Sequence, residues 1–286
     1  MAKVIGYDPV DLGYGGMVNY SGSDNNKVLD DVKDGNYPSI AVDPYQLEDL
    51  WFDWDAADLS DSYDDGDAIP ASTTVPLTTN DSSSLTMNTT ATGMTFRSAD
   101  GGSVEFTATG GIRATETDGS SYTTLSNATD ISIVQWFNTD NTVSRRCLCS
   151  RFGSQFNNFL DSGGGFLGDS QAAISGAFTT GANDGYYAGN EWVMMTFTYS
   201  VSDGIARWYA NGVEEKTDDW GTDGGAGLQA PAGAVGVRFS IGTRSDDYSP
   251  QRFDGKIAVC RLYTASLASS EILSQFNNTK TRFGIV

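Results

Sequence analysis

Carboxylates are the most numerous side chains in this sequence that could do acid–base chemistry. The 286-residue chain holds 37 Asp and Glu against 17 Lys and Arg, a formal net charge of −20, and it has no histidine. Without histidine it lacks the commonest general base, the usual partner of a Ser or Cys nucleophile, and the commonest zinc ligand. The acidic charge also repels phosphate backbones, so nucleic acid is not expected as a partner.

The densest run of possible metal ligands is an aspartate-rich stretch. It comprises Asp53, Asp55, Asp58, Asp61, Asp64, Asp65 and Asp67. Carboxylate oxygens suit calcium, but the spacing does not match the twelve-residue loop of a helix-loop-helix site. Solvated acidic loops are the simpler interpretation, so the sequence commits no residue to a metal or cofactor and leaves calcium as an open alternative.

The cysteines and the hydropathy indicate in which cellular compartment the protein is made. Cys147 and Cys149 are too close to be bridged to each other, and Cys260 is the third cysteine. We expect reduced thiols and a protein made in a cytoplasm. No apolar run approaches the roughly 18 residues that span a bilayer, so membrane insertion is not expected.

Residues 1–47 differ in composition from the remainder and are interpreted as an extended arm. Residues 1–70 carry sixteen acids against three lysines, and the first 45 residues hold many turn formers and show no sustained period of 2 or 3.6 residues. A flexible acidic tail is the alternative. Tyrosines spaced along the segment favour docking on a partner surface, because each buries an apolar ring while its hydroxyl stays solvated. The arm's tyrosines are Tyr7, Tyr14, Tyr20, Tyr37 and Tyr45.

From Leu50 onward the pattern is one of short β-like runs separated by turn formers, which is typical of a sandwich or barrel. The clearest predicted strands are 103–108, 131–137, 193–199, 205–210, 237–242 and 256–263. Asp203-Gly204 and Asn211-Gly212 predict two successive hairpin turns. One short helix is predicted near residue 270, capped by Ser269 or Ser270, with Ile272, Leu273 and Phe276 on one face. Residues expected inside the sandwich are Trp136, Phe197, Trp208 and Ile257.

Several motifs of the second half together resemble a known family. They are Glu191-Trp-Val193, Arg207-Trp-Tyr-Ala-Asn-Gly212, Phe253-Asp-Gly-Lys-Ile257 and Leu267-Ala-Ser-Ser-Glu-Ile272. In order and spacing they are similar to the laminin G-like modules of the concanavalin A-like lectin/glucanase superfamily. The resemblance implies an all-β, two-sheet antiparallel jelly-roll sandwich over residues 48–286, with one short C-terminal helix.

The glucanase branch of this superfamily implies a test for enzymatic activity. Those enzymes use paired carboxylates, often as Glu-x-Asp-x-x-Glu on one strand. The nearest match is Glu116-Thr-Asp118, but the third position is Ser121 and the segment runs into an Asp-Gly turn. We therefore expect that this protein is not an enzyme. Glu214-Glu215 is interpreted as a solvated strand edge.

A second resemblance concerns the ending Phe276-Asn-Asn-Thr-Lys-Thr-Arg-Phe-Gly-Ile285, which is similar to a tail on such modules in virion proteins of tailed bacteriophages. It implies a non-enzymatic virion protein. The expected role is capsid decoration, with the arm anchored on the major capsid protein; a homo-oligomer is compatible with the sequence.

The alternative is a tail or fibre component, or another lectin-like module, that binds host-surface glycans. Such a site needs an exposed aromatic platform. The candidates are Tyr186, Tyr187, Trp220 and Tyr248.

Overall fold

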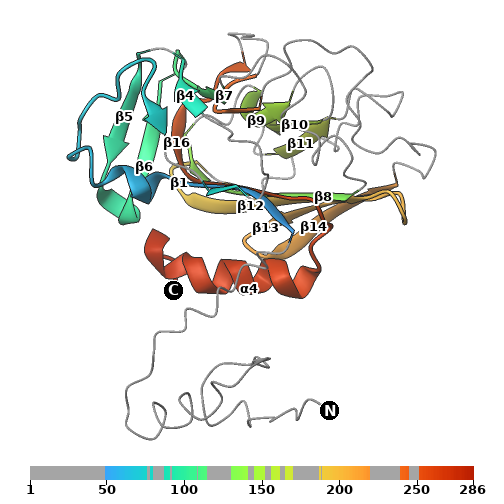
Figure 1. The fold of residues 1–286 in the computed structure, drawn as a ribbon. Coiled ribbons are helices and arrows are strands. Elements are labelled where there is room, and N and C mark those ends of the chain that lie inside the picture. The colour runs from blue at the N-terminus through green and yellow to red at the C-terminus, as the bar shows by residue number, and fades with distance from the viewer. Residues whose placement is uncertain are drawn as a thin grey trace, which may run out of the picture. The chain divides into compact units, whose positions relative to one another are not determined.

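The computed structural model describes residues 49–75, 78–79, 87–90, 92–107, 109–114, 130–140, 145–151, 156–161, 165–169, 187, 189–219, 239–244 and 251–286. Their strands form two antiparallel sheets packed face to face, and one α-helix covers the outer side of the larger sheet (Figure 1). This confirms the predicted all-β sandwich with a short C-terminal helix. The predicted arm, residues 1–47, lies outside the described residues.

The larger sheet has nine described strands. They are β1 (Leu50–Asp55), β3 (Thr78–Thr79), β5 (Met94–Arg97), β6 (Ser103–Phe106), β8 (Asp130–Asn138), β12 (Trp192–Ser200), β13 (Ile205–Ala210), β14 (Val213–Asp219) and β16 (Gly255–Tyr263). The spatial order is β14-β13-β12-β8-β16-β1-β3, and β6 and β5 extend the sheet beside β16. Strand β16 pairs with β8 on one side and with β1 on the other, so the last strand of the sequence lies in the centre of the sheet.

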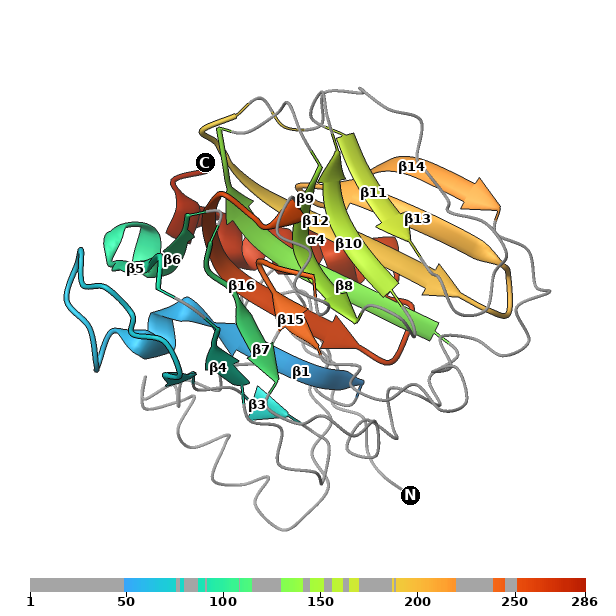
Figure 2. The same cartoon turned by 90° about the horizontal axis from the view of Figure 1, so that it is seen from above.

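The smaller sheet has seven described strands. They are β2 (Thr74–Val75), β4 (Met87–Thr89), β7 (Ile112–Ala114), β9 (Arg146–Arg151), β10 (Phe156–Asp161), β11 (Gly165–Asp169) and β15 (Ser240–Ile241). Their order is β11-β10-β9-β15-β7-β4-β2. Seen from above, β9, β10 and β11 overlie β8 and β12 of the larger sheet (Figure 2). Of the strand predicted at 237–242, β15 is the described part.

The two predicted hairpin turns are confirmed, and the residues in them adopt the positive φ values that tight turns require. Gly204 has φ +71°, and Asn211 and Gly212 have φ +51° and +82°. Two successive positive φ values are the signature of a type I′ turn, which Asn-Gly adopts most easily. The turns fix the register of β12, β13 and β14, with Phe197 opposite Trp208.

The sheets bury two separate apolar cores. The inter-sheet core lies between the sheets and includes Trp54, Ile133, Leu160, Phe197, Trp208, Ile241 and Ile257. The helix-side core lies between the larger sheet and its covering helix and includes Val134, Trp136, Met194, Tyr263, Ile272 and Phe283. Strand β8 contributes to both cores because successive side chains of a strand point to opposite faces.

Phe197, Trp208 and Ile257 lie in the inter-sheet core as predicted, but the prediction for Trp136 is wrong. Trp136 is fully buried on the opposite face of β8, in the helix-side core. The strand phase places Ile133 and Phe137 toward the smaller sheet, so Trp136 must point away from it. Both faces of β8 are apolar, which removes the contrast that would identify the inner face from sequence.

Helix α4 (Ser269–Thr279) leads into the 3-10 helix η5 (Lys280–Phe283). Its N-cap residue is Ala268, not the predicted Ser269 or Ser270. The Glu271 carboxylate accepts a hydrogen bond from the Ala268 N–H at 2.7 Å and so performs the capping. Ile272 is buried and Phe276 is partly buried against the helix-side core, whereas Leu273 is 44% exposed.

Candidate functional site

The predicted docking residues and most predicted glycan-contact residues fall on parts of the chain that the structure does not describe. Tyr7, Tyr14, Tyr20 and Tyr37 of the arm are among them. So are three glycan-contact candidates, Tyr186, Trp220 and Tyr248. These assignments stay predictions.

The fourth glycan-contact candidate, Tyr187, is described. Its side chain is only 5% exposed and belongs to the inter-sheet core. Its ring meets Phe137 edge-on, with 5.5 Å between ring centroids. A sugar-stacking platform must be exposed, so Tyr187 is a core residue in this structure.

Other aromatic side chains whose burial is described also pack inside the domain. Among the Trp, Tyr and Phe residues whose burial is described, Tyr63 and Phe276 are half-buried and all others are buried. The large apolar side chains that are exposed there are Val213, Leu273 and Val286. Among the residues whose burial is described, aromatic side chains therefore serve packing and form no exposed platform.

The predicted acidic stretch divides into two parts. Asp53 and Asp55 lie on β1 and are bound by arginines. The five remaining aspartates, from Asp58 to Asp67, are exposed. Within the described residues, no three Asp, Glu or Cys side chains are grouped so that they could hold a metal ion. Glu214 and Glu215 lie on β14, the outermost strand of the larger sheet, and are exposed as predicted.

Asp53 and Arg261 form a largely buried pair. Arg261 Nε donates to Asp53 Oδ1 at 3.0 Å, and the arginine side chain is 7% exposed. Burial raises the pKa of the Asp53 carboxyl above its ordinary value, and the positive charge of Arg261 opposes this shift only in part. The pair lies on adjacent strands, β1 and β16, where the two residues are directly opposite.

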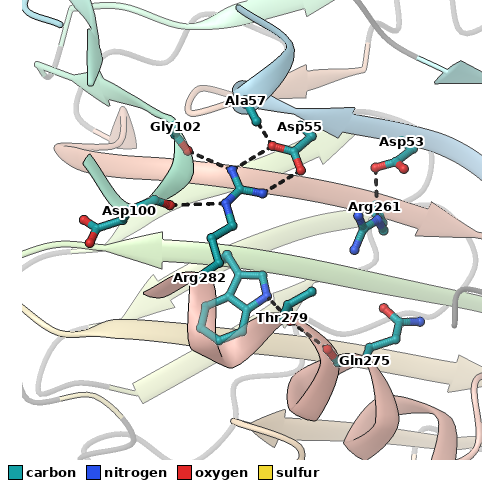
Figure 3. Close-up of polar contacts among 10 residues, drawn as sticks. Asp53, Asp55, Ala57, Asp100, Gly102, Arg261, Gln275, Thr279 and Arg282 are labelled. Atoms are coloured by element: carbon teal, nitrogen blue, oxygen red, sulfur yellow. Dashed lines mark hydrogen bonds and ion pairs between the residues drawn. The ribbon is translucent and has the colours of Figure 1, made fainter. Parts of the chain in front are cut away.

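Arg282 in η5 makes four hydrogen bonds, to one carboxylate and two backbone carbonyls (Figure 3). Its Nη1 and Nη2 donate to the two Asp55 carboxylate oxygens at 2.6 and 2.8 Å, which is a bidentate ion pair. Nη2 also donates to the Gly102 carbonyl at 2.9 Å, and Nε donates to the Asp100 carbonyl at 3.2 Å. Asp55 Oδ1 in turn accepts from the Ala57 N–H and caps the 3-10 helix η1 (Ala56–Leu59).

An aromatic stack continues this network beneath the sheet. The Trp136 ring stacks on Phe283 with 4.1 Å between centroids, and on Phe276 at 5.9 Å. Trp136 Nε1 donates to Thr279 Oγ1 at 3.1 Å, which satisfies the buried indole. We call Asp55, Trp136, Thr279, Arg282 and Phe283 the C-terminal clamp.

Two glycines with positive φ lie at the clamp, and one of them allows a close approach to Arg282. Gly101, in the 3-10 helix η2 (Ala99–Gly101), has φ +72°, and a Cβ there would lie 2.9 Å from Arg282 Cγ and Nε. Gly284 has φ +72° as well and caps η5 in the left-handed conformation, with open space where a Cβ would lie. Only Gly101 is therefore demanded by packing as well as by backbone conformation.

The C-terminal clamp is an arrangement for holding elements together. Arg282 is permanently charged, Asp55 is fully engaged by it, and Trp136 and Phe283 fill a core, so the clamp offers no proton donor and acceptor across a cleft. The sequence indicated the motif 276–285 but not its partners. The sequence places Asp55 with the acidic loops, because nothing in it links this residue to Arg282, 227 residues away.

The two-sheet antiparallel sandwich, with a helix packed on the outer face of the larger sheet, defines a lectin-like jelly roll. A profile of the concanavalin A-like lectin/glucanases superfamily matches residues 114–273, which is more than half of the chain. The chain belongs to this superfamily. A comparison with curated protein sequences finds no significant match.

Solved structures with a similar fold include domains whose described partners are carbohydrates and proteins. A botulinum neurotoxin type C structure, described as depending on two ganglioside molecules for cell entry, matches with TM-score 0.52, 13% identity and 74% coverage of this chain. The binding domain of botulinum neurotoxin DC in complex with rat synaptotagmin II has TM-score 0.51 at 13% identity, over 74% of this chain. This chain spans about half, 51%, of both neurotoxin chains.

Domain 4 of a GH43 extracellular arabinanase from Geobacillus stearothermophilus, in complex with arabinotriose, is matched over nearly its full length. The TM-score is 0.51 at 14% identity, covering 79% of this chain and 98% of that domain. At such identities the similarity establishes the fold alone.

In the described part of this chain, no helix is long and apolar enough to cross a membrane.

Proposed function

We propose that this chain is a non-enzymatic structural protein of a bacteriophage virion, made in the host cytoplasm and displayed on the outer face of the capsid. The observation that carries the proposal is the C-terminal clamp. The ending by which the sequence resembles phage virion modules, residues 276–285, supplies three of the five clamp residues and closes the outer face of the larger sheet. The resemblance thus rests on residues with a definite structural role.

A non-enzymatic role is supported by the state of the described carboxylates and by the similar structures. Asp53 and Asp55 are held by Arg261 and Arg282, and the chain has no histidine to act as a base. The similar structures include domains described as binding domains. Incubation with a panel of β-glucans and galactans should release no reducing ends. Activity that is lost in Glu116→Gln would overturn this part of the proposal.

The arm, residues 1–47, would attach the module to the major capsid protein through its tyrosines. The first described strand of the jelly roll, β1, pairs with β16 on one side and, at Phe52 and Asp53, with β3 on the other, so it has strand partners on both sides within the described residues. A protein lacking residues 1–47 should keep a cooperative thermal transition and lose binding to stripped particles. Tyr→Ala changes at Tyr7, Tyr14 and Tyr20 should weaken binding progressively. Full binding by the truncated protein would make the jelly roll the docking surface.

Glycan binding at the host surface, as a tail or fibre component, is the second candidate. The observation that favours it is the match over nearly the whole of an arabinanase domain that was solved with arabinotriose. Glycan-array binding that is lost in Trp220→Ala or Tyr248→Ala, but kept in Tyr63→Phe, would support this candidate. Quantitative mass spectrometry of purified particles separates the two roles, because decoration requires hundreds of copies and a tail part only a few.

A further inference from the structure

Two of the three cysteines face each other across the sandwich. Cys149 lies on β9 of the smaller sheet and Cys260 lies on β16 of the larger sheet. Both side chains are fully buried and both belong to the inter-sheet core. They are about 110 residues apart in sequence, so only the packing of the two sheets brings them together.

A β-bulge explains why Cys149 reaches this core. In the pairing of β9 with β10, Asn158 lies opposite Cys149 and Phe159 lies opposite Cys147, so Leu148 has no partner of its own. The extra residue changes the alternation of side chains along β9. Leu148 and Cys149 therefore both join the inter-sheet core, whereas Cys147, also buried, belongs to neither core.

The two thiols are neighbours within this core, and the proximity of Cys260 contributes to raising the pKa of the Cys149 thiol. Gln135 Nε2, on the neighbouring strand β8, donates to Cys260 Sγ at 3.5 Å and holds that sulfur in place. All three cysteines are reduced in the structure.

We propose that Cys149 and Cys260 form a disulfide that joins the two sheets when the chain folds in the presence of a disulfide oxidant such as oxidised glutathione. The site is selective for this pair because Cys147 lies outside the core that the other two share. The cross-link closes a loop of about 110 residues, and long loops give the largest loss of unfolded-state entropy.

The reaction balances as two thiol–disulfide exchanges. One protein thiolate attacks a sulfur of oxidised glutathione, which forms a mixed disulfide and releases one glutathione thiol. The second protein thiolate attacks the protein sulfur of that mixed disulfide and releases the second glutathione thiol. The protein loses two electrons and two protons, and the oxidant gains them. Burial of both thiols requires that the exchange take place before the sandwich has closed.

The test is to refold the full chain from denaturant in a buffer of reduced and oxidised glutathione. A non-reducing peptide map should show the peptide containing Cys149 linked to that containing Cys260. The oxidised protein should melt roughly 5–15 °C above the reduced protein, and a reductant added to unfolded protein should abolish the difference. Native protein incubated in the same buffer should react much more slowly.

Three single variants provide the controls. Cys147→Ala should leave both the linked peptide and the rise in Tm unchanged, whereas Cys149→Ala and Cys260→Ala should each lose both. A linked peptide containing Cys147 in place of Cys149, an oxidised form that melts below the reduced form, or refolding that leaves all thiols free would each overturn the proposal.

Discussion

Arg282 holds Asp55 through two parallel hydrogen bonds of 2.6 and 2.8 Å, although 227 residues separate them. Asp55 ends β1, the first strand of the larger sheet, and Arg282 lies in η5, beyond the helix that covers that sheet. The ion pair thus joins the beginning and the end of the described domain. Because both side chains are about one-fifth exposed, the geometry of the bidentate pair matters more than its charge alone.

We expect Arg282→Met to lower the free energy of unfolding by about 2 kcal/mol, because it removes charge-assisted hydrogen bonds to Asp55 and two backbone carbonyls. Arg282→Lys should recover only part of this loss, since an ammonium group cannot reproduce the planar fork. A double-mutant cycle with Asp55→Asn, measured by urea unfolding, should give a coupling of at least about 1 kcal/mol. A coupling near zero would show that the two residues contribute independently.

Gly101→Ala and Gly284→Ala are a matched pair, because both glycines have φ +72°. Each substitution carries the cost of a left-handed alanine, about 1 kcal/mol. Gly101→Ala must also displace Arg282, whose Cγ and Nε would lie 2.9 Å from the new Cβ, whereas Gly284 has open space. Thermal unfolding should therefore show a clearly larger loss for Gly101→Ala. Equal losses would mean that the contact between Gly101 and Arg282 is not tight.

Replacing Phe283 by alanine should lower stability strongly, whereas replacing Leu273 should change it little. Phe283 is 5% exposed and stacks on Trp136, so Phe283→Ala should cost about 3–5 kcal/mol. Leu273, in α4, is 44% exposed, and Leu273→Ala should change stability by no more than about 0.5 kcal/mol. Tryptophan fluorescence should shift to longer wavelength in Phe283→Ala alone. An unchanged Phe283→Ala protein would mean that η5 does not close the helix-side core.

Stability should fall at alkaline pH, in part because of Cys149. Burial and, to a smaller degree, the neighbouring Cys260 raise the pKa of the Cys149 thiol well above its ordinary value of 9.0. As pH rises above about 9, the unfolded chain loses this proton and the folded chain keeps it, so the unfolded state is favoured. The slope from this group is up to about 1.4 kcal/mol per pH unit.

Urea unfolding between pH 8 and pH 10, with a reductant present, measures this dependence. Cys149→Ala should be less stable than the wild type at pH 8 because it leaves a cavity, but its stability should fall less steeply. Burial also raises the pKa of Tyr199 and Tyr209 above their ordinary value of 10.0, so a decline should persist in the variant. An identical slope in both proteins would contradict the assignment to Cys149.

The sequence by itself determined the features that depend on neighbouring residues. Asn211-Gly212 makes a type I′ turn wherever it joins two strands, because both residues adopt positive φ at little cost. The alternation and density of apolar residues in 131–137 indicated a strand buried on both faces, and β8 is one. The motifs of residues 191–272 likewise indicated the superfamily, since each motif corresponds to a strand, turn or helix start with its own local pattern.

Only the tertiary structure decided which of two buried faces each residue joins and which distant residues meet. Trp136 could lie on either side of β8, and the packing of α4 and η5 made its side the helix-side core. Asp55 became the partner of Arg282 because β1 pairs with β16 and ends where η5 passes. A bulge in β9 turned Cys149 toward Cys260. These outcomes depend on strand order, register and sheet packing, which long-range contacts fix and local propensity does not encode.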